Sequence, residues 1–262
     1  MDFLSLWLTS FLFVMVFLTA LWVLSVFLKN ASIIDPFWGF GFVLIALFSI
    51  YMTGNLHARS LLVTVLVSVW GLRLSTYLFF RNLGHGEDYR YQQFRKDFGE
   101  QRYWWVSFFQ VFLLQGVIMS VVSIPLLTVY ANTEQSELGV ADFALALLWL
   151  IGFIFEAGGD FQLSRFKRKA ENKGKVMNIG FWRYTRHPNY FGNSVIWWAL
   201  GLLGIINGSI ISLISPILMT FLLVKVSGVG LLERTLKQSK PHYADYIKNT
   251  SAFFPWLPKQ NS

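Results

Sequence analysis

Residues 3–28 read FLSLWLTSFLFVMVFLTALWVLSVFL, a stretch that contains no charged side chain. The hydrocarbon core of a bilayer needs roughly 20 apolar residues in helical form, so this stretch predicts a membrane-spanning helix. It is too long for the apolar core of a signal peptide, and neither a basic segment nor a small-residue cleavage site flanks it. We therefore expect it to remain in the membrane.

Apolar stretches of this kind recur along the 262 residues, of which 55% are hydrophobic and only 14% charged. Spanning segments must form helices or a closed barrel, because lipid offers backbone groups no hydrogen-bond partners. Barrel strands would alternate in polarity over about ten residues, and these stretches do not. The sequence predicts an all-α integral membrane bundle of about seven helices in a single transmembrane domain, residues 1–262. The predicted helices cover about residues 3–28, 33–53, 60–80, 105–130, 140–158, 189–206 and 209–230.

The basic residues are distributed unevenly between the predicted helices. They collect near 81–104, near 159–188 and in the C-terminal tail, whereas 131–139 contains two glutamates and no Lys or Arg. The positive-inside rule then predicts an N-terminus outside and a C-terminus in the cytosol. The net charge of +8 is accordingly interpreted as retention at one membrane face beside membrane lipids, and not as nucleic-acid binding.

The richest polar stretch joins the fifth and sixth predicted helices. Glu156 and Asp160 are four residues apart and so share one helix face. Further on, RYTRHPNYFGN at 183–193 surrounds Pro188, which can begin a helix. A helix N-terminus flanked by arginines suits a phosphate or another anion. The alternative is an interfacial belt of aromatic and arginine side chains.

Two ionisable residues lie inside predicted helices. Asp35, in IIDPFWG, is the best candidate for an intramembrane acid, although Asp before Pro also suits a helix cap. Arg73 needs a counter-charge, and Asp35 or Glu87 would supply it. The segment from Glu87 to Tyr91 is interpreted either as a solvated loop or as a lid hinged on glycines.

Several motifs together resemble one family. They are WGLRL at 70–74, GFWRYTRHPNYFG at 180–192, LLERTL at 231–236 and PHYADYIKNTSAFFPWLP at 241–258. Their order is similar to that in the steroid 5-alpha-reductase-like membrane enzymes, especially the bacterial branch, from about residue 35 to the C-terminus. The resemblance implies a seven-helix protein of a bacterial inner membrane with a cytosolic NADPH pocket. It also implies reduction of an activated carbon–carbon double bond.

The resemblance assigns roles residue by residue. Trp70 falls where steroid reductases have a proton-donating Tyr, and Asn193 falls where relatives have Glu. These departures make steroid doubtful and leave a lipophilic enone, such as a sterol, isoprenoid or fatty-acyl lipid, as the expected substrate. The catalytic candidates are Asp35, Arg73 and Trp70. The cofactor-binding candidates are Glu156, Asp160, Lys167, Tyr184, Arg186, His187, Asn189, Tyr190, Asn193, Glu233, Arg234, Tyr243 and Tyr246.

Two other functions stay open on sequence grounds. Isoprenylcysteine-type methyltransferases, which use S-adenosylmethionine, also have R-H-P-x-Y before a helix. The continuation NYFG, the charges from Asp160 to Lys167 and a Glu233 that is not in an acidic pair favour the reductase. A transporter or non-enzymatic lipid binder is the second alternative, but the chain shows no internal repeat. No metal site is expected, because no pair of histidines has helical ligand spacing.

Overall fold

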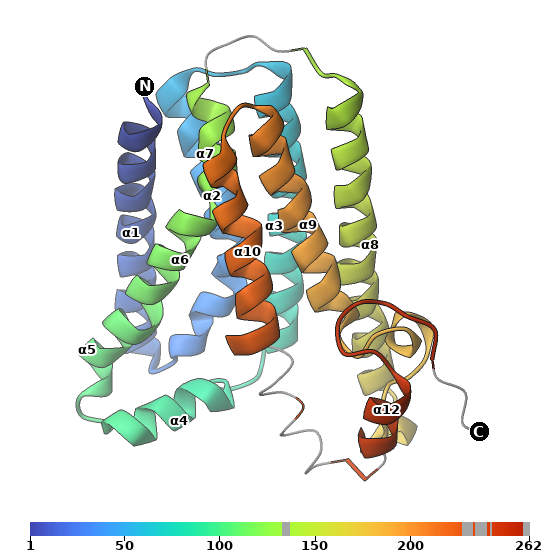
Figure 1. The fold of residues 1–262 in the computed structure, drawn as a ribbon. Coiled ribbons are helices and arrows are strands. Elements are labelled where there is room, and N and C mark those ends of the chain that lie inside the picture. Colours follow the sequence, from blue (N-terminus) through green and yellow to red (C-terminus); the bar gives the residue numbers. More distant parts are fainter. Residues whose placement is uncertain (133–136, 227–232, 234–239, 242, 259–262) are drawn as a thin grey trace. The chain divides into compact units, whose positions relative to one another are not determined.

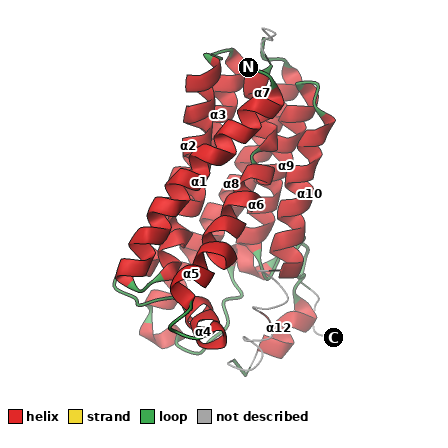
Figure 2. Cartoon of the chain, turned by 90° about the vertical axis from the view of Figure 1, so that its left-hand side faces the viewer, coloured by secondary structure: helices red, strands yellow, loops and turns green. Residues whose placement is uncertain are grey.

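The computed structural model of the protein describes residues 1–132, 137–226, 233, 240–241 and 243–258. These residues are almost entirely helical, with no strand among them (Figures 1 and 2). The chain divides into two compact units: unit 1 is Met1–Gly139 with Gly204–Ser212, and unit 2 is Val140–Leu203 with Leu213–Ser262. The expected single domain stays a prediction.

Unit 1 contains the N-terminal helices. In this unit α1 lies beside α2, α6 and α7, and α2 lies between α1 and α3 (Figure 1). The helices α2 and α3 approach closely at Gly39 and Gly71, where a Cβ added to either residue would lie 2.5 Å from the other's carbonyl oxygen. Small residues at such crossings let membrane helices pack backbone against backbone. The elements are α1 (Phe3–Leu28), the 3₁₀ turn η1 (Ala31–Ile33), α2 (Ile34–Thr53), α3 (Ala58–Asn82), α4 (Tyr89–Phe98), α5 (Tyr103–Ser107), the π-helical η2 (Phe108–Leu113), α6 (Leu114–Val122), α7 (Ile124–Ala131) and the 3₁₀ turn η5 (Ile210–Leu213).

Unit 2 is built on α8 and α9. Its closest crossing again joins two glycines, because a Cβ on Gly152 would lie 2.7 Å from the carbonyl oxygen of Gly192. One turn further along α8, Gly159 faces Pro188 at the start of α9. The elements are α8 (Val140–Arg168), the 3₁₀ turns η3 (Ala170–Asn172) and η4 (Gly180–Arg183), α9 (Pro188–Ile206), α10 (Ile214–Phe221), the π-helical η6 (Leu222–Val226) and α12 (Tyr243–Asn249).

The prediction of an apolar helical bundle is confirmed. Within the described residues, six helical segments are long and apolar enough to cross a membrane. They are Phe3–Leu28, Ala31–Thr53, Ala58–Asn82, Tyr103–Val122, Val140–Arg168 and Pro188–Ile206. The seventh predicted helix corresponds to the shorter apolar stretch Ile210–Val226, and residues 227–230 of that prediction lie outside the described residues.

The fourth predicted helix, 105–130, is wrong as a single helix. The spanning part ends at Val122, and a separate helix α7 begins at Ile124. Pro125 explains the break, since a proline has no N–H to donate and its ring would clash with the carbonyl four residues earlier. Instead Pro125 occupies the first turn of α7, where its lack of an N–H has no consequence.

The fifth predicted helix was expected to end near residue 158 and to lead into a loop. The helix α8 instead continues to Arg168. Nothing in the ten residues GDFQLSRFKR interrupts a helix, and the basic residues of the last turn complement the helix dipole. Hence Asp160 and Lys167 lie on a helix, at defined positions around its axis.

Candidate functional site

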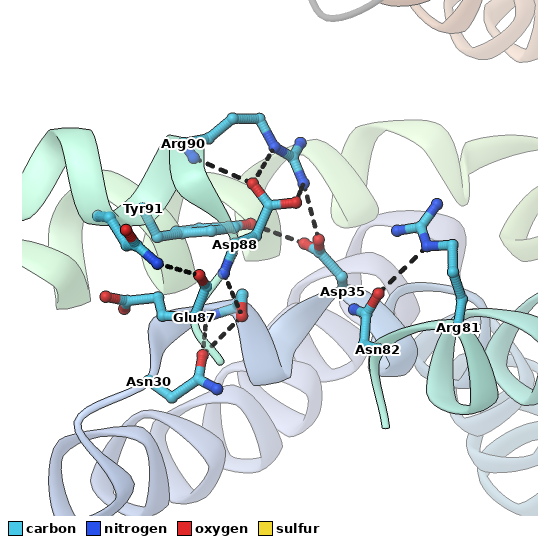
Figure 3. Close-up of polar contacts among 10 residues, drawn as sticks. Asn30, Asp35, Arg81, Asn82, Glu87, Asp88, Arg90 and Tyr91 are labelled. Carbon is cyan, nitrogen blue, oxygen red and sulfur yellow. Dashed lines mark hydrogen bonds and ion pairs between the residues drawn. The ribbon is translucent and has the colours of Figure 1, made fainter. Parts of the chain in front are cut away.

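Unit 1 holds a network of charged residues between the start of α2 and helix α4, which we call the Asp35 cluster: Asp35, Glu87, Asp88, Arg90 and Tyr91 (Figure 3). Asp35 accepts hydrogen bonds on both carboxylate oxygens, from the Tyr91 hydroxyl at 2.7 Å and from Arg90 Nη2 at 2.9 Å. Arg90 Nε also donates to Asp88 Oδ1 at 2.9 Å. The cluster thus joins residues 55 and 56 positions apart in the chain.

This arrangement corrects two expectations from the sequence. Asp35 does not cap α2, because that helix begins at Ile34 and the Asp35 carboxylate accepts from Arg90 and Tyr91. Residues 87–91 are only in part a loop, since Asp88 caps α4 by accepting from the backbone N–H of Arg90, and the helix begins at Tyr89. Burial and the neighbouring Asp35 carboxylate raise the pKa of Tyr91, so this phenol keeps its proton. The role of Asp35 as an acid stays a prediction.

Glu87 forms a second link between α4 and the chain before α2. Its carboxylate accepts from Arg95 Nη2 at 2.9 Å and Nε at 3.1 Å, and from the backbone N–H of Ala31 at 2.7 Å. The Arg95 guanidinium also lies over the ring of Tyr103, 4.6 Å from its centroid. No local signal in the sequence predicts these pairings, because the partners come from three separate elements.

The remaining catalytic candidates also lie in unit 1. Trp70 is fully buried on α3 and packs edge-to-face against Phe42, with the ring centroids 5.7 Å apart. Arg73 lies one turn further along α3 and is half-buried. Its counter-charge stays a prediction, although Arg90 and Arg95 bind the two carboxylates expected to supply it.

Unit 2 holds a second polar network at the start of α9, which we call the α9 cluster: Asp160, Arg186, His187, Asn189, Asn193 and Glu233. The predicted pairing of Glu156 with Asp160 on one face of α8 is seen, since both are buried, 3% and 6% exposed. Asn189 Nδ2 donates to Asp160 Oδ1 at 3.0 Å and so joins α9 to α8. The glycine crossing of the two helices brings these side chains together.

Arg186 is held by several partners. Its Nε donates to Glu233 Oε1 at 2.7 Å, and its Nη1 donates to the carbonyl of Ile247 at 3.0 Å and to that of Thr250. His187 lies 3.3 Å from the same Glu233 oxygen. Burial alone would favour a neutral Glu233, but the bonds from His187 and Arg186 prevail and lower its pKa. Arg186 therefore stabilises the α9 cluster by connecting it to Glu233 and to the C-terminal segment.

The C-terminal segment completes this site. The backbone N–H of Arg186 donates to the carbonyl of Ser251 at 2.9 Å, and that of Trp256 donates to the carbonyl of Tyr184 at 2.9 Å. Tyr246 donates its hydroxyl hydrogen to the carbonyl of Trp182, and burial followed by Glu233 raises the pKa of Tyr243 to about 12. The tail motif thus packs against the RYTRHP motif.

The remaining cofactor candidates have different surroundings. Tyr184 is 39% exposed and lines a cavity of about 410 Å³ with Phe155, Pro255, Trp256 and Leu257. Tyr190 stacks on His187, with the rings 5.3 Å apart and nearly parallel. Lys167 is exposed, and Arg234 lies outside the described residues.

Asn193 is the unusual member of the α9 cluster. It is 8% exposed, and its side-chain oxygen Oδ1 has no hydrogen-bond partner among the residues that the structure describes. A buried carbonyl oxygen without a donor costs about 1–3 kcal/mol. A bound ligand with an N–H or O–H would satisfy it.

Sequence reasoning overlooked Lys240, which belongs to the surroundings of the α9 cluster. Its Nζ donates to the carbonyl of Lys175 at 2.6 Å. Burial and the positive charge of Lys167 lower the pKa of Lys240, so two lysines from distant parts of the chain lie within electrostatic reach. The only signal in the sequence was the general excess of basic residues.

Long apolar helices with buried polar clusters define the protein as a multi-pass α-helical membrane protein. The chain belongs to the DUF1295 family, a protein family of unknown function, whose model matches residues 21–250. It is also similar to the uncharacterized protein C594.04c of Schizosaccharomyces pombe, with 26% identity over 267 residues. That similarity covers 90% of this chain and 76% of the yeast protein.

Proposed function

We propose that the protein is an NADPH-dependent membrane reductase that acts on an activated carbon–carbon double bond of a lipophilic substrate. In this proposal the α9 cluster binds the cofactor from the cytosolic side. The protein lies in a bacterial inner membrane, with its N-terminus on the side away from the cytosol. The association of the DUF1295 family with steroid 5-alpha-reductase-like proteins supports the proposal.

The observation that carries the choice of cofactor is the charge around the α9 cluster. Glu233 is ion-paired with Arg186 and hydrogen-bonded to His187, which leaves its carboxylate poorly suited to binding a further cation. Lys167 and Lys240 lie close enough that one lowers the pKa of the other. Two neighbouring lysines attract phosphates and repel a sulfonium ion, which favours a dinucleotide over S-adenosylmethionine.

The residues present fit such a cofactor. Lys167 and Lys240 would hold its phosphates, and the buried Asn193 oxygen would accept from an amide N–H. The Asp160–Asn189 pair offers polar atoms for a ribose hydroxyl. When bound, NADPH supplies a hydride to the β-carbon of an enone.

The chain's own residues have the remaining tasks. Arg186 and Glu233 connect the start of α9 to the C-terminal segment and so keep the cluster rigid. In unit 1, Arg73 is a cation within a spanning helix and stays the residue that the sequence predicts for polarising a carbonyl oxygen. In unit 1, Asp35 stays the acid that the sequence predicts, with its carboxylate hydrogen-bonded to the Tyr91 hydroxyl.

Direct binding assays test the proposal. We expect NADPH to quench the tryptophan fluorescence of the purified protein, and S-adenosylmethionine to have no effect. Lys167→Gln should weaken NADPH binding by about tenfold, as expected for one charge-assisted hydrogen bond. The matched control is Lys173→Gln, which removes the same charge from an exposed position in the following loop.

Three outcomes would overturn the assignment. Quenching by S-adenosylmethionine alone would make the protein a methyltransferase, and quenching by neither would favour a lipid binder or transporter. An equal loss in both lysine variants would show a diffuse electrostatic effect and no defined phosphate site.

The proposed orientation has its own test. The chain contains no cysteine, so one introduced cysteine gives an unambiguous labelling site. With a membrane-impermeant maleimide on intact cells, Leu56→Cys should be labelled and Lys173→Cys should not. The reverse pattern would place the N-terminus in the cytosol.

A further inference from the structure

One face of α8 is exposed along most of the helix and changes from apolar to cationic. Phe143, Leu147, Ile154 and Phe161 are 63%, 59%, 49% and 64% exposed. Their spacings of four and seven residues place them on one line along a helix. We call this line, with Arg165 and Arg168, the α8 stripe.

The two arginines continue the same line. Arg165 follows Phe161 by four residues and Arg168 by seven, and both are exposed. Together with Ser164 and Phe161 they line a cavity of about 270 Å³ on the surface of α8. The aromatic ring and two guanidinium groups therefore border the same hollow.

The length of α8 places this hollow at the membrane surface. A helix of 29 residues is about 43 Å long, whereas the hydrocarbon core is about 30 Å thick. About nine residues therefore extend beyond the hydrocarbon. Because Val140–Arg168 ends in a basic turn, those nine residues include Arg165 and Arg168.

The stripe is separate from the face of α8 that bears the cofactor candidates. Glu156, Asp160 and Lys167 share a second line, at spacings of four and seven residues. At about 100° per residue, the middle of this line lies about 160° around the helix from Arg165 and about 100° from Arg168. Lys167 thus belongs with the α9 cluster, and the two arginines face elsewhere.

We propose that the α8 stripe binds an anionic phospholipid, with the acyl chain along Phe161 and Ile154 and the phosphate between Arg165 and Arg168. The order along the stripe, apolar and then cationic, is the order of groups in a phospholipid. Guanidinium groups bind phosphate through paired hydrogen bonds. The neighbouring Lys169 is paired with Glu171, its Nζ 3.5 Å from the Glu171 carboxylate, so the positive charge of the stripe comes from the two arginines. That charge disfavours a lipid with a cationic headgroup.

Native mass spectrometry of the detergent-solubilised full chain, titrated with phosphatidylglycerol or phosphatidylcholine, tests this proposal. Arg165→Gln with Arg168→Gln should weaken phosphatidylglycerol binding by about 30-fold, given about fivefold for each basic residue at the surface. Arg165→Lys with Arg168→Lys keeps the charge but loses the paired geometry, so an intermediate loss is expected. Lys173→Gln with Lys175→Gln is the matched control and should change affinity by less than about threefold.

Several results would overturn the proposal. An equal loss in the arginine and lysine pairs would indicate diffuse attraction, and equal binding of phosphatidylcholine would exclude a preference for anionic lipid. Displacement of the lipid by millimolar inorganic phosphate or by NADPH would assign the hollow to a soluble phosphate. Unchanged NADPH quenching in the arginine variants is the expected result, because it would separate this site from the proposed cofactor site.

Discussion

Glu87 connects α4 to the chain before α2, and its neutralisation tests whether α4 is a docked element. In Glu87→Gln the side chain keeps its shape but loses its charge. The Glu87 side chain is 8% exposed. Its carboxylate accepts two hydrogen bonds from Arg95 and one from the backbone N–H of Ala31. A glutamine can keep one oxygen acceptor, and its amide group then faces the Arg95 guanidinium as a second donor.

The size of the effect follows from this geometry. Removing one partner of a buried ion pair costs about 3–5 kcal/mol, because the other charge stays buried. The Arg95 side chain is 23% exposed, so water screens part of that loss. We expect about 2 kcal/mol, or a melting temperature lower by roughly 5 °C.

Hydrogen exchange locates the effect. Apart from Arg95, helix α4 is held chiefly by Tyr91 and Arg90, so the backbone amides of Tyr89–Phe98 should exchange faster in the variant. Asp97→Asn is the matched control, because it removes a carboxylate from the same helix where only an exposed bond from Gln93 is lost. Unchanged exchange in α4, or equal destabilisation by both variants, would refute the docking of α4 by Glu87.

The other predictions concern packing, pH and turnover. Gly71→Ala should destabilise unit 1 by at least about 2 kcal/mol because the added Cβ meets the Gly39 carbonyl, whereas Gly86→Ala, with nothing within 4 Å, should be neutral in thermal unfolding. Glu233 has a lowered pKa in the folded chain. Its contribution to stability is therefore fully present above the ordinary glutamate pKa of 4.5 and is lost as pH falls through the lower pKa of the folded chain. Wild type and Glu233→Gln should therefore converge in melting temperature at acid pH. Asp35→Asn should leave NADPH quenching intact and lower turnover; unchanged turnover would exclude Asp35 from the proton transfer.

The sequence predicted the parts of the fold that depend on local composition. Apolar stretches of spanning length are recognisable one by one, and the same-face position of Glu156 and Asp160 follows from helical periodicity. The break before α7 was also predictable, because Pro125 cannot continue a helix. The end of α8 was not, since hydropathy measures where a helix leaves the lipid and not where it stops.

The pairings within the two clusters depended on the tertiary fold. Arg90 reaches Asp35 across 55 residues, and Arg186 reaches Glu233 across 47. The sequence contains several opposite charges that could pair with each of these residues. Which pair forms depends on how the helices pack. Arg186 was expected from family resemblance to bind a cofactor, and the structure shows its guanidinium bonded to the chain itself.

The hydrogen bonds from Arg186 to Ile247 and from Trp256 to Tyr184 determine the order in which the protein inserts and folds. Residues 247–256 are synthesised after all the apolar segments of the chain, so the helices enter the membrane before their polar cluster can close. During that interval the charged start of α9 lacks its hydrogen-bond partners from the C-terminal segment and contacts water or a chaperone. Variants of residues 247–256 should therefore leave the helices inserted in the membrane and yet increase degradation of the protein by quality-control proteases.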